Sequence, residues 1–305
     1  MPFESPALLI ANPHATKARR PVIDKVIAAV AGQSWVDIAY TEAKGHAIDM
    51  AANAVDKGYR TILALGGDGT FNEVVNGVGD SDIVVAPVPA GSTNVVARSL
   101  GYANDPVRAI RVMRNDAHPQ RMTVGSMNGR RFVFACGCGL DASVARLVDA
   151  HPDWKRRLGA LYFTGSAVYG YFREYWQNPV QLSYQADEVG DAGITVIAQN
   201  SHPFSYFRGQ SVTLAKSASM ADPDLAVVAM TELSTYNVPS LLSRVFIERL
   251  GAVSHRHVRE TEHVQLLRVK GDREFPVQVD GDYVGDFLDV TISTEPDSVN
   301  ILVPN

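Results

Sequence analysis

Two kinds of sequence pattern alternate along the N-terminal third of the chain, and this alternation limits the folds that the chain can adopt. Short apolar runs, typical of buried strands, occupy residues 7–12, 34–40, 61–65 and 82–89. Segments with helical spacing lie between them, at residues 17–32, 45–58 and 71–78. Strands separated by helices in this way predict an α/β domain with a parallel sheet built from strand–helix–strand crossovers.

The pattern changes after residue 118, where short strand-like runs dominate and many of them end at Gly, Asn or Asp. Such runs predict a β-sandwich-like second domain, interrupted by helices at residues 142–150, 154–176 and 238–251. We therefore expect domains at residues 1–118 and 119–305, with a hinge at 114–120 and with the final residues able to pack back on the first domain.

Composition excludes several classes of protein. The net charge of −5 over 305 residues provides no general basic field for nucleic acid. Cys136 and Cys138 form a C-x-C pair without a second pair, which is a poor zinc site and indicates reduced cysteines in a cytoplasmic protein. The N-terminus lacks the pattern of a signal peptide. The apolar stretch 157–176 contains Arg173 and Glu174, so we expect a buried or lipid-facing helix rather than a membrane span.

The sequence "LALGGDGTFNEVVNGV" joins a predicted strand directly to a predicted helix. Thr70 and Glu73 fit the T-x-x-E capping box, which explains these two residues without any ligand.

The glycines of this motif call for a further explanation. A capping box does not require Gly66, Gly67 and Gly69 around Asp68, whereas a phosphate site does, because bare backbone N–H groups can approach a polyanion. Asp68 beside phosphates is expected to act through a metal ion or as a proton acceptor. The motif therefore predicts a phosphate site in the turn 66–70.

Three more polar loops, "ANPHATK", "YTEAKGHA" and "VPAGSTN", follow predicted strands. Each alone is a turn with a helix cap, for which Ser92 or Thr93 is the candidate in the last loop. Because the carboxyl ends of parallel strands meet at one edge of the sheet, the loops together predict a nucleotide site. Asn12, Thr41, Ser92 and Asn94 would supply its neutral donors and acceptors.

Two later segments leave alternatives open. In "VQVDGDYVG", Asp280-Gly281 is a strong signal for a plain two-residue hairpin, although its acidic residues could also serve a site. "SHRHV" at residues 254–258 indicates a solvated basic stretch more readily than a ligand site. With Arg244 and Arg249 it could form a patch for acidic lipid headgroups.

The segments "NPHAT", "GGDGTFNEVVNG", "VPAGSTNVVARSLG", "GCGLDASV" and "VQVDGDYVG" follow one another in the order found in diacylglycerol kinase-like lipid kinases, which the chain resembles over most of its length. The family includes soluble bacterial diacylglycerol kinases and sphingosine and ceramide kinases. The glycine-rich segment alone is shared with NAD kinases and phosphofructokinases, and "GCGLDASV" with "VQVDGD" makes the resemblance more specific. The resemblance implies transfer of phosphate from ATP to a lipid hydroxyl with Mg²⁺, between a nucleotide-binding N-terminal domain and a β-rich, lipid-binding C-terminal domain.

The resemblance also assigns roles by position. The residues that match the nucleotide-phosphate loop are Gly66, Gly67, Gly69 and Thr70. Asp68 matches the aspartate near Mg²⁺ and the transferred phosphate, and Asn12 matches the Asn-Pro loop at the nucleotide. Ser92 keeps a hydroxyl where the family often has threonine. The match favours Asp282 as the general base and Asp280 as a neighbour of nucleotide or metal.

Three positions depart from the family pattern. Val95 stands where many members have aspartate, and Asp282 stands where an Asp-Gly-Glu motif has glutamate. Pro223 replaces the glycine of a turn that holds a structural Mg²⁺ in some bacterial members. Val95 removes one acidic group from the metal network that the resemblance implies, and Asp282 shortens another by one methylene. Because of Pro223, we expect no structural Mg²⁺ site at this turn.

The sequence leaves alternatives to a diacylglycerol kinase. An NAD kinase-like enzyme is one, but a soluble acceptor would not need the long apolar helix at 157–176. A non-catalytic lipid-binding protein is another, since Val95 and Asp282 depart from the pattern. The expected partner is a membrane lipid, reached by peripheral contact from the cytoplasm, and a homodimer stays open.

Overall fold

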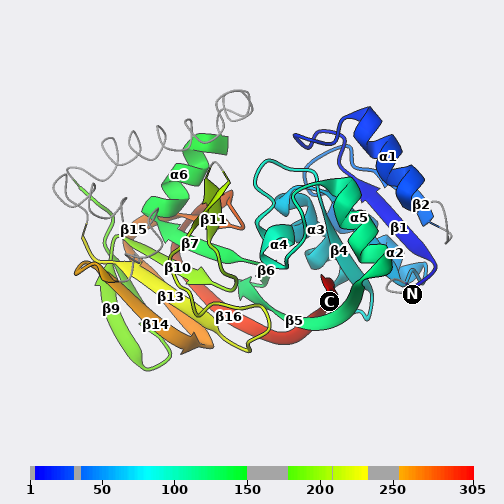
Figure 1. The fold of residues 1–305 in the computed structure, drawn as a ribbon. Coiled ribbons are helices and arrows are strands. Elements are labelled where there is room, and N and C mark those ends of the chain that lie inside the picture. The colour runs from blue at the N-terminus through cyan, green and yellow to red at the C-terminus, as the bar shows by residue number, and fades with distance from the viewer. Residues whose placement is uncertain (1–3, 31–35, 150–177, 208, 233–253) are drawn as a thin grey trace. The chain divides into compact units, whose positions relative to one another are not determined.

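The computed structural model describes residues 4–30, 36–149, 178–207, 209–232 and 254–305 (Figure 1). Its contacts divide the chain into two compact units. Unit 1 comprises Met1–Thr123 with Asp297–Asn305, and unit 2 comprises Val124–Pro296. The predicted helices at 154–176 and 238–251 lie wholly outside the described residues.

Unit 1 is an α/β structure, as the alternation of patterns predicts. Its elements are β1 (Ala7–Ala11), α1 (Arg20–Val30), β2 (Val36–Tyr40), α2 (His46–Asp56), β3 (Thr61–Gly66), α3 (Asp68–Val78), β4 (Val84–Pro89), α4 (Val95–Ser99) and α5 (Pro106–Asn115). The strands are parallel in the order β4-β3-β1-β2, and the last part of β16 (Asp282–Pro304) continues the sheet beside β4. The predicted parallel sheet is therefore confirmed.

The two faces of this sheet are covered by different helices. Leu9 and Leu63 on one face pack with Ile23 of α1 and Ile110 of α5 in one apolar core. α2 and α3 pack tightly against each other, since a Cβ on Gly77 would lie only 2.3 Å from a backbone oxygen of α2. Burial of both faces explains why β1, β3 and β4 are continuous apolar runs.

The sequence patterns did not reveal α5. Asp105 caps its first turn by accepting a hydrogen bond of 2.8 Å from the backbone N–H of Arg108, and Pro106 occupies the first helical position. The predicted hinge at 114–120 contains the end of this helix and the start of β5 (Ala117–Met127).

Unit 2 is β-rich, as predicted. Its further elements are β6 (Arg130–Phe132), β7 (Ala135–Gly139), α6 (Leu140–Asp149), β8 (Leu182–Ala186), β9 (Val189–Gly193), β10 (Thr195–Gln199), β11 (Ser205–Phe207), β12 (Gln210–Val212), β13 (Leu225–Met230), β14 (Val258–Val264) and β15 (Leu266–Val279). Antiparallel pairs give the order β14-β13-β10-β7-β15-β16, and α6 packs beside β7 and β15 (Figure 1). Cys136 and Cys138 of β7 form no disulfide and are buried in the apolar core of unit 2, as expected.

Not every Gly or Asp in this half of the chain ends a strand. The strand β15 continues through Gly271 and Asp272, and its register with β16 shifts between Lys270 and Phe275. The turn residues Gly271 and Asp272 therefore mark an irregularity within a strand rather than its end.

Candidate functional site

The glycine-rich segment forms a very tight strand-to-helix turn. β3 ends at Gly66 and α3 begins at Asp68, so Gly67 alone separates them. The predicted five-residue loop at 66–70 is therefore wrong, because its last three residues already belong to the helix. A Cβ on Gly66 would come within 2.4 Å of the Thr70 hydroxyl oxygen, which explains that glycine by packing. Gly67 lies against the backbone of Gly91, in the loop that follows the neighbouring strand β4.

The predicted capping box at Thr70 and Glu73 is also wrong. The N-terminus of α3 has no side-chain cap. Glu73 instead accepts hydrogen bonds from the backbone N–H groups of Gly45 at 2.8 Å and Ala47 at 3.2 Å, and so caps the neighbouring helix α2. The Thr70 hydroxyl accepts a hydrogen bond of 3.1 Å from the Asn12 side chain. Both side chains therefore join separate elements of unit 1.

Asp68 reaches from the start of α3 to the start of α4. Its Oδ1 accepts a hydrogen bond of 3.0 Å from the backbone N–H of Val96. Burial raises the pKa of this carboxyl above its usual value, against the opposing effect of backbone N–H groups of Val95 and Val96. The Asp68 carboxylate thus caps the start of α4.

Asn94 organises the loop that follows β4. It adopts a left-handed conformation with φ of 54°, and its side chain accepts from Gly91 N–H at 2.8 Å and donates to the Asn104 side chain at 2.7 Å. The expected capping of α4 by Ser92 or Thr93 is wrong, because Asn94 is the N-cap residue and the side-chain bond to this helix comes from Asp68.

The loops after β1, β2, β3 and β4 lie at the same edge of the parallel sheet. Backbone bonds run from Asn12 N–H to Leu65, from Thr41 N–H to Ala11, and from Ala90 N–H to Gly66. Thr41 is buried at this edge, and Ser92 is exposed. The structure therefore brings together the elements that carry the predicted nucleotide residues, which follows from the shared direction of the strands.

A second polar cluster lies within unit 2 and joins the two segments "GCGLDASV" and "VQVDGD". Gln278 of β15 donates a hydrogen bond of 2.9 Å to Oδ2 of Asp141 in α6 and accepts one of 2.7 Å from Gly281 N–H. Burial raises the pKa of Asp141 to about 6, and the Gln278 bond opposes that rise. Gly137 is required beneath the pair, since a Cβ there would lie 2.1 Å from Asp141. Sequence reasoning assigned no role to Asp141 or Gln278, although a carboxylate within an apolar motif is a usable signal.

The buried carboxylate of Asp280 binds backbone N–H groups of its own domain. Its carboxylate oxygens accept three hydrogen bonds, from Val133 and Phe134 N–H at 2.8 Å and from Ala135 N–H at 3.1 Å. Asp280 and Gly281 both have positive φ, as a type I′ hairpin requires. The hairpin interpretation is therefore confirmed, and a nucleotide or metal role for Asp280 stays a prediction.

Asp282 pairs with Val279 across this hairpin as the first residue of β16. Beyond it, Arg146 of α6 lies 5.8 Å from the centre of the Tyr283 ring and 3.3 Å from Oδ1 of Asp286. These half-exposed groups were not singled out from the sequence, because α6 and β16 are distant along the chain.

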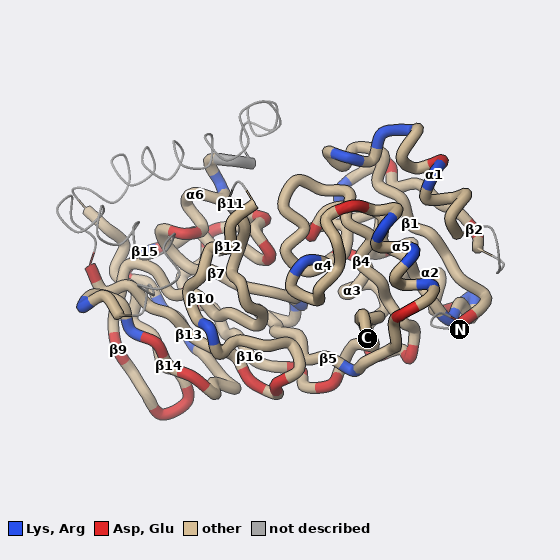
Figure 2. Tube along the Cα trace, viewed as in Figure 1, with Lys and Arg blue, Asp and Glu red and all other residues tan. Residues whose placement is uncertain are grey.

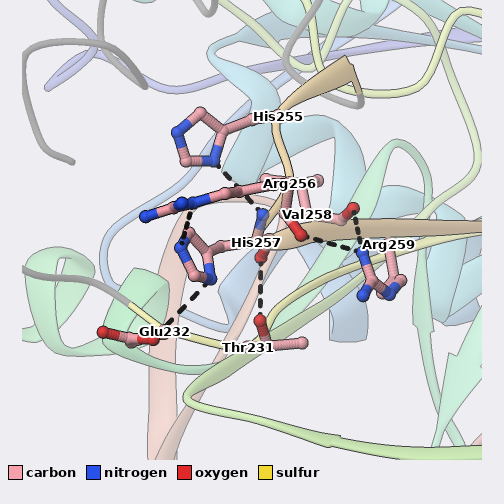
Figure 3. A network of polar contacts seen from close by, with 7 residues as sticks. All are labelled: Thr231, Glu232, His255, Arg256, His257, Val258 and Arg259. Atoms are coloured by element: carbon pink, nitrogen blue, oxygen red, sulfur yellow. Dashed lines mark hydrogen bonds and ion pairs between the residues drawn. The ribbon is translucent and has the colours of Figure 1, made fainter.

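The histidines of "SHRHV" form a network among themselves and their neighbours (Figure 3). His257 Nε2 lies 2.8 Å from Arg256 Nε, and its Nδ1 lies 3.7 Å from a carboxylate oxygen of Glu232. His255 Nδ1 accepts a bond of 3.3 Å from His257 N–H. Across the described residues, no group of three or more His, Cys, Asp or Glu side chains is arranged to hold a metal ion.

Two predictions about lipid contact fall on residues that the structure does not describe. They concern the apolar stretch at 157–176 and the arginines at 244 and 249. In the part of the chain that is described, none of the helices combines the length and apolar character needed to span a bilayer.

Comparison with known proteins identifies both parts of the chain. Residues 6–127 match the sequence pattern of the diacylglycerol kinase catalytic domain, and residues 135–303 match that of the YegS C-terminal NAD kinase beta sandwich-like domain. A diacylglycerol kinase of Staphylococcus saprophyticus is 36% identical over 95 residues, which are 30% of this chain and 31% of that protein. One of Staphylococcus haemolyticus is 37% identical over 95 residues, 30% of this chain and 28% of that protein. The match thus spans about a third of the length of these curated relatives.

Solved structures share the fold over the whole chain. A crystal structure of a diacylglycerol kinase from Bacillus anthracis str. Sterne has a TM-score of 0.76 and 20% identity, covering 100% of this chain and 98% of that one. A second crystal structure from the same strain has a TM-score of 0.79 at 20% identity, covering 100% and 96%. Because the two domain patterns follow each other along nearly the full length and the second covers more than half of it, the chain belongs to the diacylglycerol kinase-like lipid kinase family.

Proposed function

We propose that this protein transfers the terminal phosphoryl group of ATP to the hydroxyl of a membrane lipid, with diacylglycerol as the acceptor and phosphatidic acid as the product. The observation that carries the proposal is the turn at Gly67, where a strand end, the start of α3 and the start of α4 meet around Asp68. This arrangement supports phosphate binding, because backbone N–H groups at helix starts favour anions.

The nucleotide would lie along the loops of unit 1. In this proposal Gly66, Gly67, Gly69 and Thr70 hold its phosphates, and Asn12, Thr41, Ser92 and Asn94 supply neutral donors and acceptors. Asn12 and Asn94 already fix their loops through bonds to Thr70 and Gly91. A loop held before the ligand arrives needs less ordering when it binds.

A magnesium ion would be held by Asp68 together with the nucleotide phosphates. Mg²⁺ sites that use one or two carboxylates plus substrate phosphates are common, so a single carboxylate at this turn fits such a site and does not build a cage of protein ligands. Val95 occupies the next position after Asn94 and adds no acidic group. Bound there, the ion would neutralise charge on the transferred phosphoryl group.

Asp282 is the proposed general base, which would accept the proton of the lipid hydroxyl, and Asp68 is the alternative. A base contributes about 10² to 10⁴ in rate. The Gln278 bonds to Asp141 and Gly281 support Asp282 indirectly, since they fix the hairpin from which it projects. The enzyme would meet its lipid by peripheral contact with a membrane from the cytoplasm. Homodimer formation is compatible with this reaction but is not needed for it.

The test is an assay of transfer from labelled ATP to a panel of acceptors. The panel contains diacylglycerol, a sphingoid base, ceramide, phosphatidylglycerol and NAD, with and without Mg²⁺. We expect labelled phosphatidic acid, and we expect Asp68→Ala to lower its formation at least about 100-fold while the fold is kept. Turnover by Asp68→Ala equal to that of the unchanged protein would sink the assignment.

The same assay separates the alternative functions. Label in NADP would identify an NAD kinase-like enzyme. Label in no acceptor, together with retained binding to lipid vesicles, would identify a non-catalytic lipid-binding protein. Label in another lipid of the panel would keep the reaction class and replace only the acceptor.

A further inference from the structure

A cavity of about 1010 Å³ lies between α1 and α5, on one side of unit 1. Five cationic side chains line it: Lys17, Lys25, Arg108, Arg111 and Arg114. Among the described lining residues, Asp105 is the only carboxylate, and it caps α5. Figure 2 shows the lysine and arginine positions along α5 and beside the start of α1. The chain as a whole carries a net charge of −5, so this cluster is a local feature.

The spacing of the three arginines on α5 explains why all of them line the cavity. Arg108, Arg111 and Arg114 recur every three residues on α5, while Ile110 and Met113 of the same helix are buried in the core. The rise over these two intervals is about 9 Å, at about 1.5 Å per residue. A ligand that contacts all three arginines must therefore carry negative charge at more than one place.

Most of the cationic groups in the cavity have no anionic partner among the described residues. Among the residues that the structure describes, Lys25, Arg108 and Arg111 form no ion pair. Lys17 donates to the backbone and side-chain oxygens of Asn104, at 3.2 and 2.7 Å. Burial, and then the nearby charge of Arg98, lower the pKa of Lys17, and the charge of Asp105 opposes this shift without cancelling it. Convergence of like charges from two helices costs free energy, which a bound anion would offset.

We propose that this cavity binds a soluble anion with several phosphate groups. Guanidinium groups bind phosphate oxygens through two parallel hydrogen bonds, and lysine adds a point charge. Arg114 also donates to the Ala29 carbonyl oxygen at 3.3 Å and thereby ties the two helices together behind the exposed cations. The volume suits a ligand of small-molecule size.

A membrane surface fits this cavity less well. The exposed large apolar side chains of the described residues are Ile38, Tyr40, Ile48, Val189 and Leu288, and none of them lines the cavity. The apolar residues that line the cavity are small ones, Val22, Ala28, Ala29, Pro106 and Val107, whereas helices that dock on a bilayer place large apolar side chains such as Trp, Phe and Leu beside their cationic ones. A small soluble ligand can also enter a concave site between two helices, whereas a flat layer of headgroups cannot.

The test uses inositol hexakisphosphate as the probe and the full-length protein, with calorimetric titration at about 0.15 M salt to screen weak surface attraction. The variant Arg108→Gln/Arg111→Gln removes two cavity charges. The control Lys57→Gln/Lys270→Gln removes two exposed charges elsewhere. We expect one binding site, weakened at least about tenfold by the first pair and changed less than about twofold by the second. Equal weakening by both pairs would show unspecific attraction and overturn the proposal.

Two further measurements locate the site and its source of phosphate. Hydrogen exchange on the unchanged protein should show protection by the probe in α1 and α5. Protection confined to the loops after β3 and β4 would place the probe at the nucleotide site and reject the cavity. Sedimentation with phosphatidylglycerol vesicles gives the second readout. If the arginine pair removes vesicle binding but leaves probe binding unchanged, the surface serves acidic lipid headgroups and the proposal is wrong.

Discussion

The side-chain amide of Gln278 donates a hydrogen bond of 2.9 Å to the carboxylate of Asp141, across 137 residues of sequence. The oxygen of the same amide accepts from Gly281 N–H at 2.7 Å. One buried side chain therefore holds the start of α6 and the hairpin before Asp282 in a fixed relation within unit 2.

Replacing Gln278 should destabilise the protein. Gln278→Ala removes both bonds and leaves the Asp141 carboxylate without this donor, at a cost of about 1–3 kcal/mol in the free energy of unfolding. Urea denaturation at neutral pH measures this cost. Gln210→Ala, at an exposed position of β12, is the matched control and should cost less than about 0.5 kcal/mol. Equal midpoints for the two variants would contradict the role given to Gln278.

Asp141 should make stability depend on pH between about 4 and 6. Its folded pKa of about 6 lies above the ordinary value of 3.8, so the folded state holds the proton more tightly than the unfolded chain does. Stability is therefore higher below pH 4 and falls as pH rises towards 6, by roughly 3 kcal/mol from this group alone.

Asp141→Asn isolates that contribution, because the amide cannot ionise. Unfolding free energies of the variant and the unchanged protein, measured at several pH values, should differ by a slope confined to the range between 4 and 6. Parallel curves across this range would show that Asp141 does not titrate as inferred.

The sequence predicts those features of the fold that depend on local patterns. β1, β3 and β4 are buried on both faces, so their apolar runs are continuous and their alternation with helices is visible. The parallel arrangement follows from that alternation, and it brings the loops of Asn12, Gly66 and Asn94 to one edge.

Side-chain partners that are distant in sequence could not be predicted in this way. Glu73 looks like a capping residue of its own helix, but the N–H groups that it satisfies lie in α2. Asp68 likewise caps α4, 28 residues away. The helix α5 could not be predicted from its pattern, because only a narrow stripe of its residues is buried and its exposed face is rich in arginine. It is also short and lies between turn-forming residues at 104–106 and 115–116.

The glycines of the strand-to-helix turn should separate folding from phosphate binding. A Cβ on Gly67 would meet its nearest neighbour, Gly91, at 3.4 Å, and its backbone conformation suits any residue. We expect Gly67→Ala to stay folded, with Tm lowered by no more than about 4 °C, but to bind ATP at least about tenfold more weakly because the methyl group covers the approach to the backbone.

Gly66→Ala provides the contrast, since its Cβ would lie 2.4 Å from the Thr70 hydroxyl and must displace α3. That variant should lose stability and ATP binding together. Thermal unfolding and equilibrium ATP binding of both variants make the comparison. Unchanged ATP affinity in Gly67→Ala would place the phosphates elsewhere.

Removing the Asp280 carboxylate should destabilise the protein more than removing an exposed carboxylate that makes similar bonds to backbone N–H groups. Asp280 accepts three backbone N–H bonds in a buried site, and Asp187 accepts two, from Gln265 and Leu266, at an exposed turn. Both residues have positive φ, so the local strain relieved or imposed by a substitution is similar.

Asp280→Ala leaves buried donors unsatisfied and should lower the free energy of unfolding by about 3–5 kcal/mol. In Asp187→Ala water replaces the lost bonds, so the loss should be only about 1 kcal/mol. Denaturation of the two variants measures the difference. If Asp280→Ala is no less stable than Asp187→Ala but loses ATP binding, Asp280 serves the nucleotide or its metal rather than the fold.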